Sequence, residues 1–412
     1  MAAKKRRSCM DDLPEEVLQE VFSRVGNVKD LFRLAVTCRR WLCRFTDPAF
    51  LQGLWGEGHR AHLHGFFFQQ QTRREGASVF EPTFLPTPGS PLRALASFDD
   101  GNFTHAETLA ARRGIVLMQL APRAVGTRLF DLCNPITGER HVLPPLRCSC
   151  FADVYTCYAI ITAADSDLDA KKPSSSARFA FSQLLLAILT TDRKVNLHSY
   201  SAATRSWSAP AMCLDKVTHI SPVGERSAIV HRGAAHWLWI NNDNNVLYKL
   251  STEVGKHPCV LSLRKLPQLR VGGSPLLCVG RDGQLSVACA YPMHVTVWTQ
   301  HGEDTAWLRT AVIRLPMPTT LNQIRLHENP PHLPLEKWLD FDRGSMLVLH
   351  RGSTVSILDL DKKVVEKIMD DCLLPTFSHV FDQTRSVAYK MDLVKFFLLH
   401  LGGLCSGRRP TE

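Results

Sequence analysis

The sequence lacks long apolar runs, and this absence argues against a membrane-spanning segment. Of its 412 residues, 45% are hydrophobic and 21% are charged, which is the composition of a soluble globular protein. The longest apolar stretch near the C-terminus, residues 394–404, contains Lys395 and His400 and is too short to span a bilayer. No apolar run follows the basic N-terminus. The sequence therefore predicts neither a signal peptide nor a membrane partner.

Regular cysteine and histidine spacings are also missing. The 13 cysteines are odd in number and irregularly spaced, which predicts reduced thiols in the nucleus, the cytoplasm or both. Cys148, Cys150 and Cys157 lack the paired short spacings and the fourth ligand of a zinc site. His62 and His64 have no further ligands nearby and are interpreted as surface residues. No metal site is expected.

Motifs for catalysis or cofactor binding are absent as well. The chain has no phosphate loop, no dinucleotide fingerprint and no nucleophile elbow. His231 and His236 lie near Trp237 and are interpreted as packed side chains. We interpret Trp207, Trp298 and Trp307 as aromatic packing residues, although a binding face is the alternative. We expect no cofactor and no catalytic residue; an enzyme built on the C-terminal region is the competing hypothesis.

Positive charge is in excess, with a net charge of +10, but six of the basic residues lie in residues 4–7 and 408–409. The rest are dispersed, which argues against a nucleic-acid partner. The basic run at residues 4–7 is typical both of a nuclear import signal and of a solvated tail.

A helical pattern occupies residues 14–25. Pro14 suits a first helical turn because the N–H that it lacks would have no partner there. Glu15 and Glu16 complement the positive end of the helix dipole. Apolar residues then recur at helical spacing, at Val17, Leu18, Val21, Phe22 and Val25. Gly26 is expected to end this helix.

Two more helices are expected before residue 48. Asn27 can cap the second, and Asp47-Pro48 is expected to end the third. The apolar residues of these helices are Val28, Leu31, Leu34, Ala35, Cys38, Trp41, Leu42 and Phe45. So short a bundle buries little surface alone, so a partner chain or the following domain must cover part of it. The spacing does not decide between the two.

Together these segments resemble an F-box. The resemblance is carried by residues 13–17, 20–25, 29–34, 37–41 and 47–51, with Thr37 where valine is more usual. It implies that residues 11–50 dock on the Skp adaptor of a cullin-type ubiquitin ligase. The implied contact residues are Leu13, Pro14, Val17, Leu18, Val21, Phe22, Val25, Leu31, Leu34, Cys38, Trp41 and Phe45.

The chain changes character after the helices. Residues 51–91 hold a glutamine run and four prolines after residue 81, which predicts an irregular linker. From residue 92, short apolar runs alternate with polar turns, which indicates hairpins. The predicted strands are 115–120, 128–133, 184–189, 195–200, 228–230, 236–240, 246–250, 276–279, 285–290, 295–299, 346–349, 354–360 and 364–368.

These strands form a loose repeat. Comparable polar turns occur near Thr137, Thr204, Thr252, Asp304 and Lys362, at separations of 48 to 67 residues. Several strands per unit at this spacing favour the blades of a β-propeller, with a β-sandwich pair as the competing arrangement. Residues 132–139, 143–145 and 233–238 resemble the F-box-associated β domains of plant proteins, especially those of cereal grasses. That resemblance implies a domain that recognises a target protein.

The predicted fold class is thus α+β multidomain, with a small helical F-box and a large, propeller-like β domain. The predicted division is a disordered basic tail (1–10), an F-box (11–50), a linker (51–91), the β domain (92–405) and a second tail (406–412). The predicted function is that of a non-catalytic adaptor that holds a Skp protein, through it a cullin, and an unknown target protein. The alternative is a Skp-binding protein outside a working ligase. Removal of residues 92–412 is expected to leave Skp binding intact.

Overall fold

The structure is a computed structural model of the 412-residue chain. The residues that it describes are 14–55, 63–74, 77–87, 90–92, 106–120, 126–148, 156–166, 181–190, 192–214, 219–224, 226–255, 261–270, 274–280, 282–291, 294–302, 306–314, 337–342, 346–351, 354–359, 364–369 and 387–406. The predicted tail 1–10 and the predicted contact residue Leu13 lie outside this set, as does nearly all of the tail predicted at 406–412.

The N-terminal segment forms four helices, α1 (Glu15–Ser23), α2 (Val28–Ala35), α3 (Arg39–Arg44) and α4 (Pro48–Trp55). The Asn27 side chain accepts a hydrogen bond of 2.9 Å from the backbone N–H of Lys29, which confirms the predicted cap of α2. The three helices predicted before residue 48 are confirmed, and a fourth helix that was not predicted, α4, follows them. Asp47-Pro48 not only follows α3 but also starts α4, because proline fits a first helical turn and Asp47 accepts from the N–H of Ala49.

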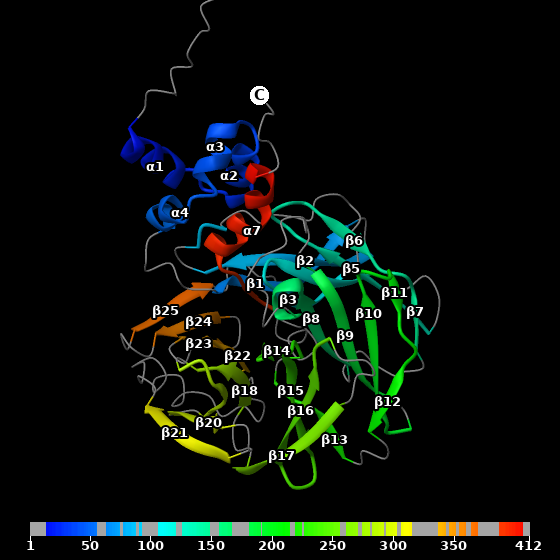
Figure 1. Ribbon diagram of the computed structural model, residues 1–412. Coiled ribbons are helices and arrows are strands. Elements are labelled where there is room, and N and C mark those ends of the chain that lie inside the picture. The colour runs from blue at the N-terminus through cyan, green and yellow to red at the C-terminus, as the bar shows by residue number, and fades with distance from the viewer. Residues whose placement is uncertain are drawn as a thin grey trace, which may run out of the picture.

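Five antiparallel sheets of four or five strands follow, and they are the blades of a β-propeller (Figure 1). Blade 1 contains β3 (Glu107–Arg112), β4 (Ile115–Leu120), β5 (Thr127–Cys133), β6 (Arg140–Val142) and β7 (Leu146–Arg147). Blade 2 contains β8 (Thr156–Thr162), β9 (Phe181–Leu189), β10 (Val195–Ser201), β11 (Ser206–Trp207) and β12 (Ala211–Leu214), with the single turn α5 (Ala163–Ser166) after β8.

The remaining blades repeat this plan. Blade 3 contains β13 (Ile220–Pro222), β14 (Ile229–His231), β15 (Ala234–Asn241), β16 (Val246–Glu253) and β17 (Leu261–Arg270). Blade 4 contains β18 (Ser274–Val279), β19 (Leu285–Ala290), β20 (His294–His301) and β21 (Ala306–Arg314). Blade 5 contains β22 (Lys337–Asp342), β23 (Met346–Arg351), β24 (Thr354–Asp359) and β25 (Val364–Met369).

A three-stranded sheet, the closing sheet, joins the two ends of the propeller. It orders β2 (Ala77–Pro86), β1 (Leu63–Arg74) and β26 (Val387–Lys390), so a strand from near the C-terminus pairs with one that follows the helices. The prediction of an irregular linker at 51–91 was therefore wrong. Two of the prolines that suggested a linker, Pro82 and Pro86, lie on β2, which is an edge strand. Proline is tolerated on an edge strand, because the strand has a neighbour on one side only and fewer of its N–H groups are needed for hydrogen bonds between strands.

The hairpins predicted from residue 115 onward are confirmed, and each predicted run overlaps a strand of the expected blade. The repeat that the sequence indicated is the connection between the third and fourth strands of each blade. In blade 1, for example, residues 134–139 connect β5 to β6. The propeller, rather than the sandwich pair, is the arrangement that forms.

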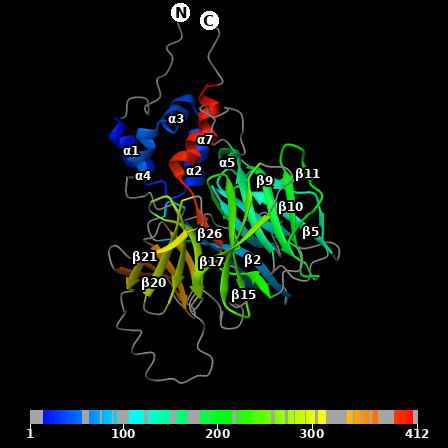
Figure 2. The same cartoon turned by 60° about the horizontal axis from the view of Figure 1, so that its bottom comes forward.

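A long C-terminal helix, α7 (Leu393–Ser406), was not predicted; residues 393–405 were assigned to the β domain. It lies beside α3 and α4, directly after β26 (Figure 2). One continuous core joins the N-terminal helices, α7 and the near side of the propeller, and it includes Phe22, Phe45, Phe67, Tyr389 and Phe397. The helices therefore pack directly against the propeller through this shared core. Among the described helices, none is both long and apolar enough to cross a membrane.

Candidate functional site

The first candidate site is the outer side of α1. Val17 and Val21 lie one turn apart on it, with exposed fractions of 42% and 40%. At the end of α2, Leu34 and Val36 are exposed to 36% and 50%. These exposed apolar side chains on neighbouring helices are accessible to a partner chain.

The structure divides the twelve predicted contact residues into groups. Pro14, Val17, Val21, Leu34 and Cys38 are exposed, and Val25 and Trp41 are partly buried. Leu18, Phe22, Leu31 and Phe45 are buried inside the chain's own core. Val36 is an exposed apolar residue that the sequence reasoning missed, although its place at the end of an apolar helix was a visible signal.

The buried members hold the helices together. The ring of Phe22 packs edge-on against Trp41, Phe45 and Phe50, with centroid distances of 4.5, 5.0 and 6.0 Å. Such aromatic pairs add about 0.5–1.5 kcal/mol each beyond the burial of apolar area. These side chains therefore position the exposed ones, and their role in adaptor contact stays a prediction.

Helix α7 completes this packing from the far end of the sequence. Phe397 is fully buried, and its ring centroid lies 5.2 Å from Trp55, 5.6 Å from Phe45 and 5.7 Å from Phe32. In the closing sheet, His64 Nε2 lies 2.9 Å from the carbonyl oxygen of Met391, just before α7. His64 is buried, so its interpretation as a surface residue was wrong, while His62 lies outside the described residues.

A cavity of about 730 Å³, here called the axial cavity, lies where α7 meets the inner strands of the propeller. Its apolar part comes from β14, β18, β26 and α7. The residues that line it are Ala111, Arg112, Arg113, Thr162, Ser227, Ala228, Ile229, Val230, Val279, Ala388, Lys390, Met391, Asp392, Lys395, Phe396, Leu398, Leu399 and His400. The cavity is lined mostly by apolar side chains. Four lysines and arginines and a single aspartate also line it, so its charged residues are mainly basic.

Asp165, on α5, binds the two arginines that line the axial cavity. Arg112 donates to Asp165 Oδ1 over 2.7 Å, and the Arg113 guanidinium lies 3.2 Å from the same oxygen. Thr162 adds a backbone N–H and a hydroxyl, each 2.8 Å from Oδ2. Burial by itself would raise the pKa of Asp165, but the hydrogen bond and charge of Arg112, then the charge of Arg113, outweigh it and lower the pKa. This carboxylate stays ionised and ties blade 1 to blade 2.

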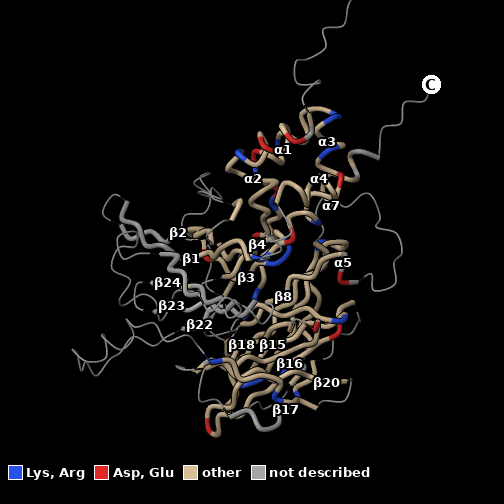
Figure 3. The backbone as a smooth tube through the Cα atoms, turned by 90° about the vertical axis from the view of Figure 1, so that its left-hand side faces the viewer, with Lys and Arg blue, Asp and Glu red and all other residues tan. Residues whose placement is uncertain are grey.

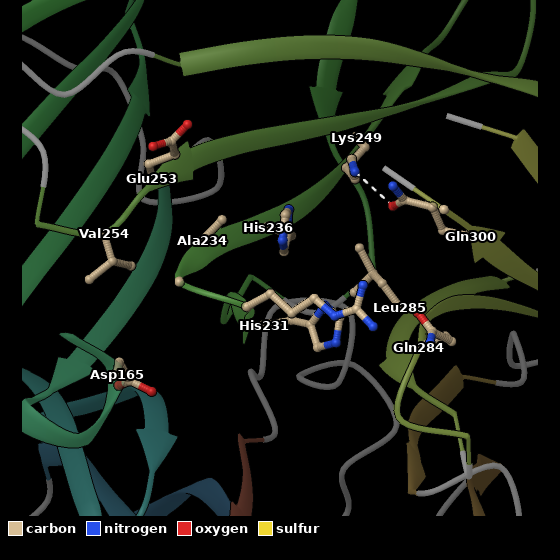
Figure 4. A pocket seen from close by; sticks show the side chains of 13 residues that line it. Asp165, His231, Ala234, His236, Lys249, Glu253, Val254, Gln284, Leu285 and Gln300 are labelled. Atoms are coloured by element: carbon tan, nitrogen blue, oxygen red, sulfur yellow. Dashed lines mark hydrogen bonds between the residues drawn. The ribbon is translucent and has the colours of Figure 1, made fainter. Parts of the chain in front are cut away.

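A second cavity of about 550 Å³, here called the side cavity, lies between blades 3 and 4 (Figure 4). The residues that line it are Asp165, His231, Arg232, Gly233, Ala234, His236, Lys249, Glu253, Val254, Gln284, Leu285, Gln300 and Gly302. His231 and His236, which the sequence reasoning treated as packed side chains, both line it. Lys249 and Gln300 were missed; no local motif marks them, because they come from different blades.

The other residues that the sequence singled out have packing roles or lie outside the described residues. Cys157 is buried on β8, Cys148 is partly buried, and Cys150 lies outside the described set. Within the part of the chain that the structure describes, no group of three or more histidine, cysteine or acidic side chains is placed to hold a metal. Trp207 donates to the carbonyl of Pro144, and Trp307 is buried in the blade core.

Comparison with known proteins gives a match at the N-terminus. Residues 10–51 match the family model described as F-box-like. A protein of Arabidopsis thaliana named as an F-box/kelch-repeat protein is 38% identical over 64 residues, which is 15% of this chain and 16% of that one. The chain thus matches less than a fifth of that relative, and the cereal-grass type and the F-box-associated domain are not supported by these matches.

Solved structures show only distant similarity. A prolyl endopeptidase structure shares 9% identity at a TM-score of 0.38, over 87% of this chain and 46% of that one. An oligogalacturonate lyase of Vibrio parahaemolyticus shares 11% identity at a TM-score of 0.30, over 74% and 84% of the two chains. At such TM-scores neither supports a statement about activity. From the family match and the sheet topology together, the chain carries an F-box-like domain at its N-terminus and a β-propeller after it.

Proposed function

We propose that this chain is a substrate-recognition adaptor of a Skp–cullin–F-box ubiquitin ligase. Its F-box-like domain would bind a Skp adaptor, and its propeller would bind a target protein. The observation that carries the proposal is the exposed valine pair on α1, Val17 and Val21, within the segment that matches the F-box-like model. The chain itself would contribute proximity, and the ubiquitin transfer would take place on other subunits.

The propeller supports the second half of the proposal. Loops on a rigid scaffold are where recognition usually lies, and both cavities open among turns and strand ends of different blades. We propose the nucleus, the cytoplasm or both as the place of action of this chain, because the irregularly spaced cysteines suit reduced thiols there and the basic run at residues 4–7 is typical of a nuclear import signal as well as of a solvated tail. Figure 3 shows acidic and basic positions interspersed over the described chain, which is consistent with a protein partner rather than a nucleic acid.

The proposal is tested by charge substitutions on α1. The double variant Val17→Asp, Val21→Asp should lose co-precipitation of a Skp protein from the same organism, because two carboxylates would have to be buried in the interface. Its thermal unfolding should stay within a few degrees of the unaltered chain, since both positions are exposed. Val142→Asp is the matched control, because Val142 is 58% exposed on β6, in the propeller.

Two outcomes would count against the proposal. If the unaltered chain fails to precipitate any Skp protein, adaptor binding is wrong. If Skp binds but cullin does not co-precipitate with the pair, the alternative holds: a Skp-binding protein that acts outside a working ligase.

A further inference from the structure

The side cavity contains a buried cation with uncharged partners. Lys249, on β16, is only 7% exposed. Its Nζ donates to Gln300 Oε1 over 2.9 Å and lies 5.9 Å from the ring centre of Trp307. Burial lowers the pKa of Lys249, and the charge of Arg264 lowers it further. A buried ammonium is normally paired with an anion, so this end of the cavity is suited to receive one.

A buried imidazole faces the same space. His236, on β15, is 8% exposed, and its Nδ1 has no hydrogen-bond partner among the described residues. Buried polar atoms are nearly always paired. Burial, followed by the charges of Lys249 and His231, outweighs a hydrogen bond to the His231 backbone and lowers the pKa of His236 to about 3, so the ring is neutral near pH 7. A neutral imidazole carries one N–H, and with the proton on the unpaired Nδ1 it can donate to an oxyanion without adding charge to the site.

The walls around these two groups are fixed. His231 Nε2 lies 2.8 Å from the carbonyl oxygen of Gly283, which ties the β14–β15 turn to the β18–β19 turn of the next blade. Arg232 and Gly233 form that first turn with φ angles of 48° and 71°, and the exposed Arg232 adds a second cation at the rim. In Figure 4, Asp165 and Glu253 lie on the opposite side of the cavity from Lys249 and Gln300. The two acidic side chains of the cavity therefore lie away from Lys249.

We propose that the side cavity is an oxyanion-binding site, which takes a carboxylate or a phosphate group carried by a segment of the target protein. Lys249 supplies a positive charge to the oxyanion, and His236 donates a hydrogen bond to it. Arg232 supplies a second positive charge at the rim of the cavity. The axial cavity shares a wall with it, since Val230 lines one and His231 the other.

The assignment of the anion to a target protein rests on the proposed function, whereas the anion site itself does not. The first test is a calorimetric titration of the purified full-length chain with inorganic phosphate. Lys249→Met and His236→Phe should each lower the affinity by about tenfold or more, the usual effect of losing a hydrogen bond to a charged group. Lys265→Met is the matched control: it makes the same change on β17, at an exposed position outside the cavity.

Thermal unfolding separates a binding role from a structural one. Lys249→Met removes a buried charge, so it should leave the unfolding temperature unchanged or raise it while phosphate affinity falls. A large drop in stability with unchanged phosphate affinity would overturn the proposal. So would the absence of phosphate binding by the unaltered chain, or an equal loss in Lys265→Met.

The second test identifies the source of the anion. Degenerate peptide pools with a fixed central phosphoserine, aspartate or serine are passed over the immobilised chain. Retention of the phosphoserine or the aspartate pool above the serine pool, and its loss in Lys249→Met, supports the proposal and tells phosphate from carboxylate. Equal retention of all three pools would overturn the assignment to a target segment. Failure to bind a Skp protein would instead remove the proposed function while leaving the phosphate result standing.

Discussion

At the scale of single residues, Asp165 is a clear case of one side chain that joins two neighbouring blades of the propeller. It follows β8 in blade 2, and its carboxylate accepts from Arg112 and lies beside Arg113 at the end of β3 in blade 1. The side chain of Asp165 is 5% exposed and that of Arg112 is 16% exposed. Removing one member of such a pair leaves the other charge without compensation.

The Asp165→Asn variant should therefore lose about 2–3 kcal/mol of unfolding free energy at pH 7. The pKa of Asp165 is lowered in the folded protein, so its contribution is present above the ordinary pKa and is lost as the pH falls through the folded pKa. The difference between the two proteins should stay constant from pH 7 to about 5 and shrink below about pH 4. Denaturant unfolding at several pH values measures this difference in unfolding free energy between the unaltered chain and Asp165→Asn.

Asp243→Asn is the control for this measurement, because Asp243 lies on an exposed turn of blade 3. It should leave the unfolding midpoint unchanged. A difference for Asp165→Asn that grew toward low pH would contradict the role assigned to this carboxylate.

At the scale of secondary-structure elements, α7 changes what a truncation can be expected to do. The sequence alone predicts that Skp binding survives removal of residues 92–412. In the structure, α7 places Phe397 against Phe45, Trp55 and Phe32, so the F-box-like helices depend on it for part of their core. We therefore expect that a chain without α7 loses Skp binding.

A chain that ends at residue 392 should lose co-precipitation of a Skp protein although residues 14–55 are intact. A chain that ends at residue 406 keeps α7 and should bind normally. Phe397→Ala should cost about 3–5 kcal/mol, the usual effect of truncating a buried phenylalanine to alanine. Normal Skp binding by the chain that ends at 392 would show that the four helices fold without α7.

At the scale of the whole molecule, the shared core of helices and propeller sets the position of the exposed α1 face relative to the two cavities. On the proposed function, these are the adaptor-binding face and the target-binding cavities. A bound target would then be held at a set distance from the rest of a ligase. Removal of residues 1–50 would expose that core, so full-length variants are the better tools for separating the two binding functions.

On the proposed function, the Val17→Asp, Val21→Asp chain should retain more captured target protein in cells than the unaltered chain, because it would bind the target without recruiting the ligase. Inhibiting the proteasome should remove this difference. The measurement is quantitative mass spectrometry of proteins that co-purify with each chain, with Val142→Asp as control. Equal yields without the inhibitor would indicate that the protein acts outside a working ligase.

Local patterns in the sequence determined much of this architecture. The cap at Asn27, the apolar face of α1 and the hairpins around residues 134–139 depend on residues close together in the chain, whose spacing shows which side chains share a face. The same patterns determined the propeller, since a ring of similar hairpin units buries strand edges that a single unit would expose.

Only the tertiary structure decided which distant segments meet. The pairing of Phe66 with Ala388, the burial of Phe397 among the N-terminal helices and the approach of Lys249 to Gln300 join residues far apart in sequence. The spacing of apolar residues identifies the buried face of a helix. It does not identify the surface against which that face packs, because several surfaces of the chain could bury a similar apolar area. Likewise, a lysine becomes a candidate anion ligand only when folding removes it from water and leaves it beside uncharged groups.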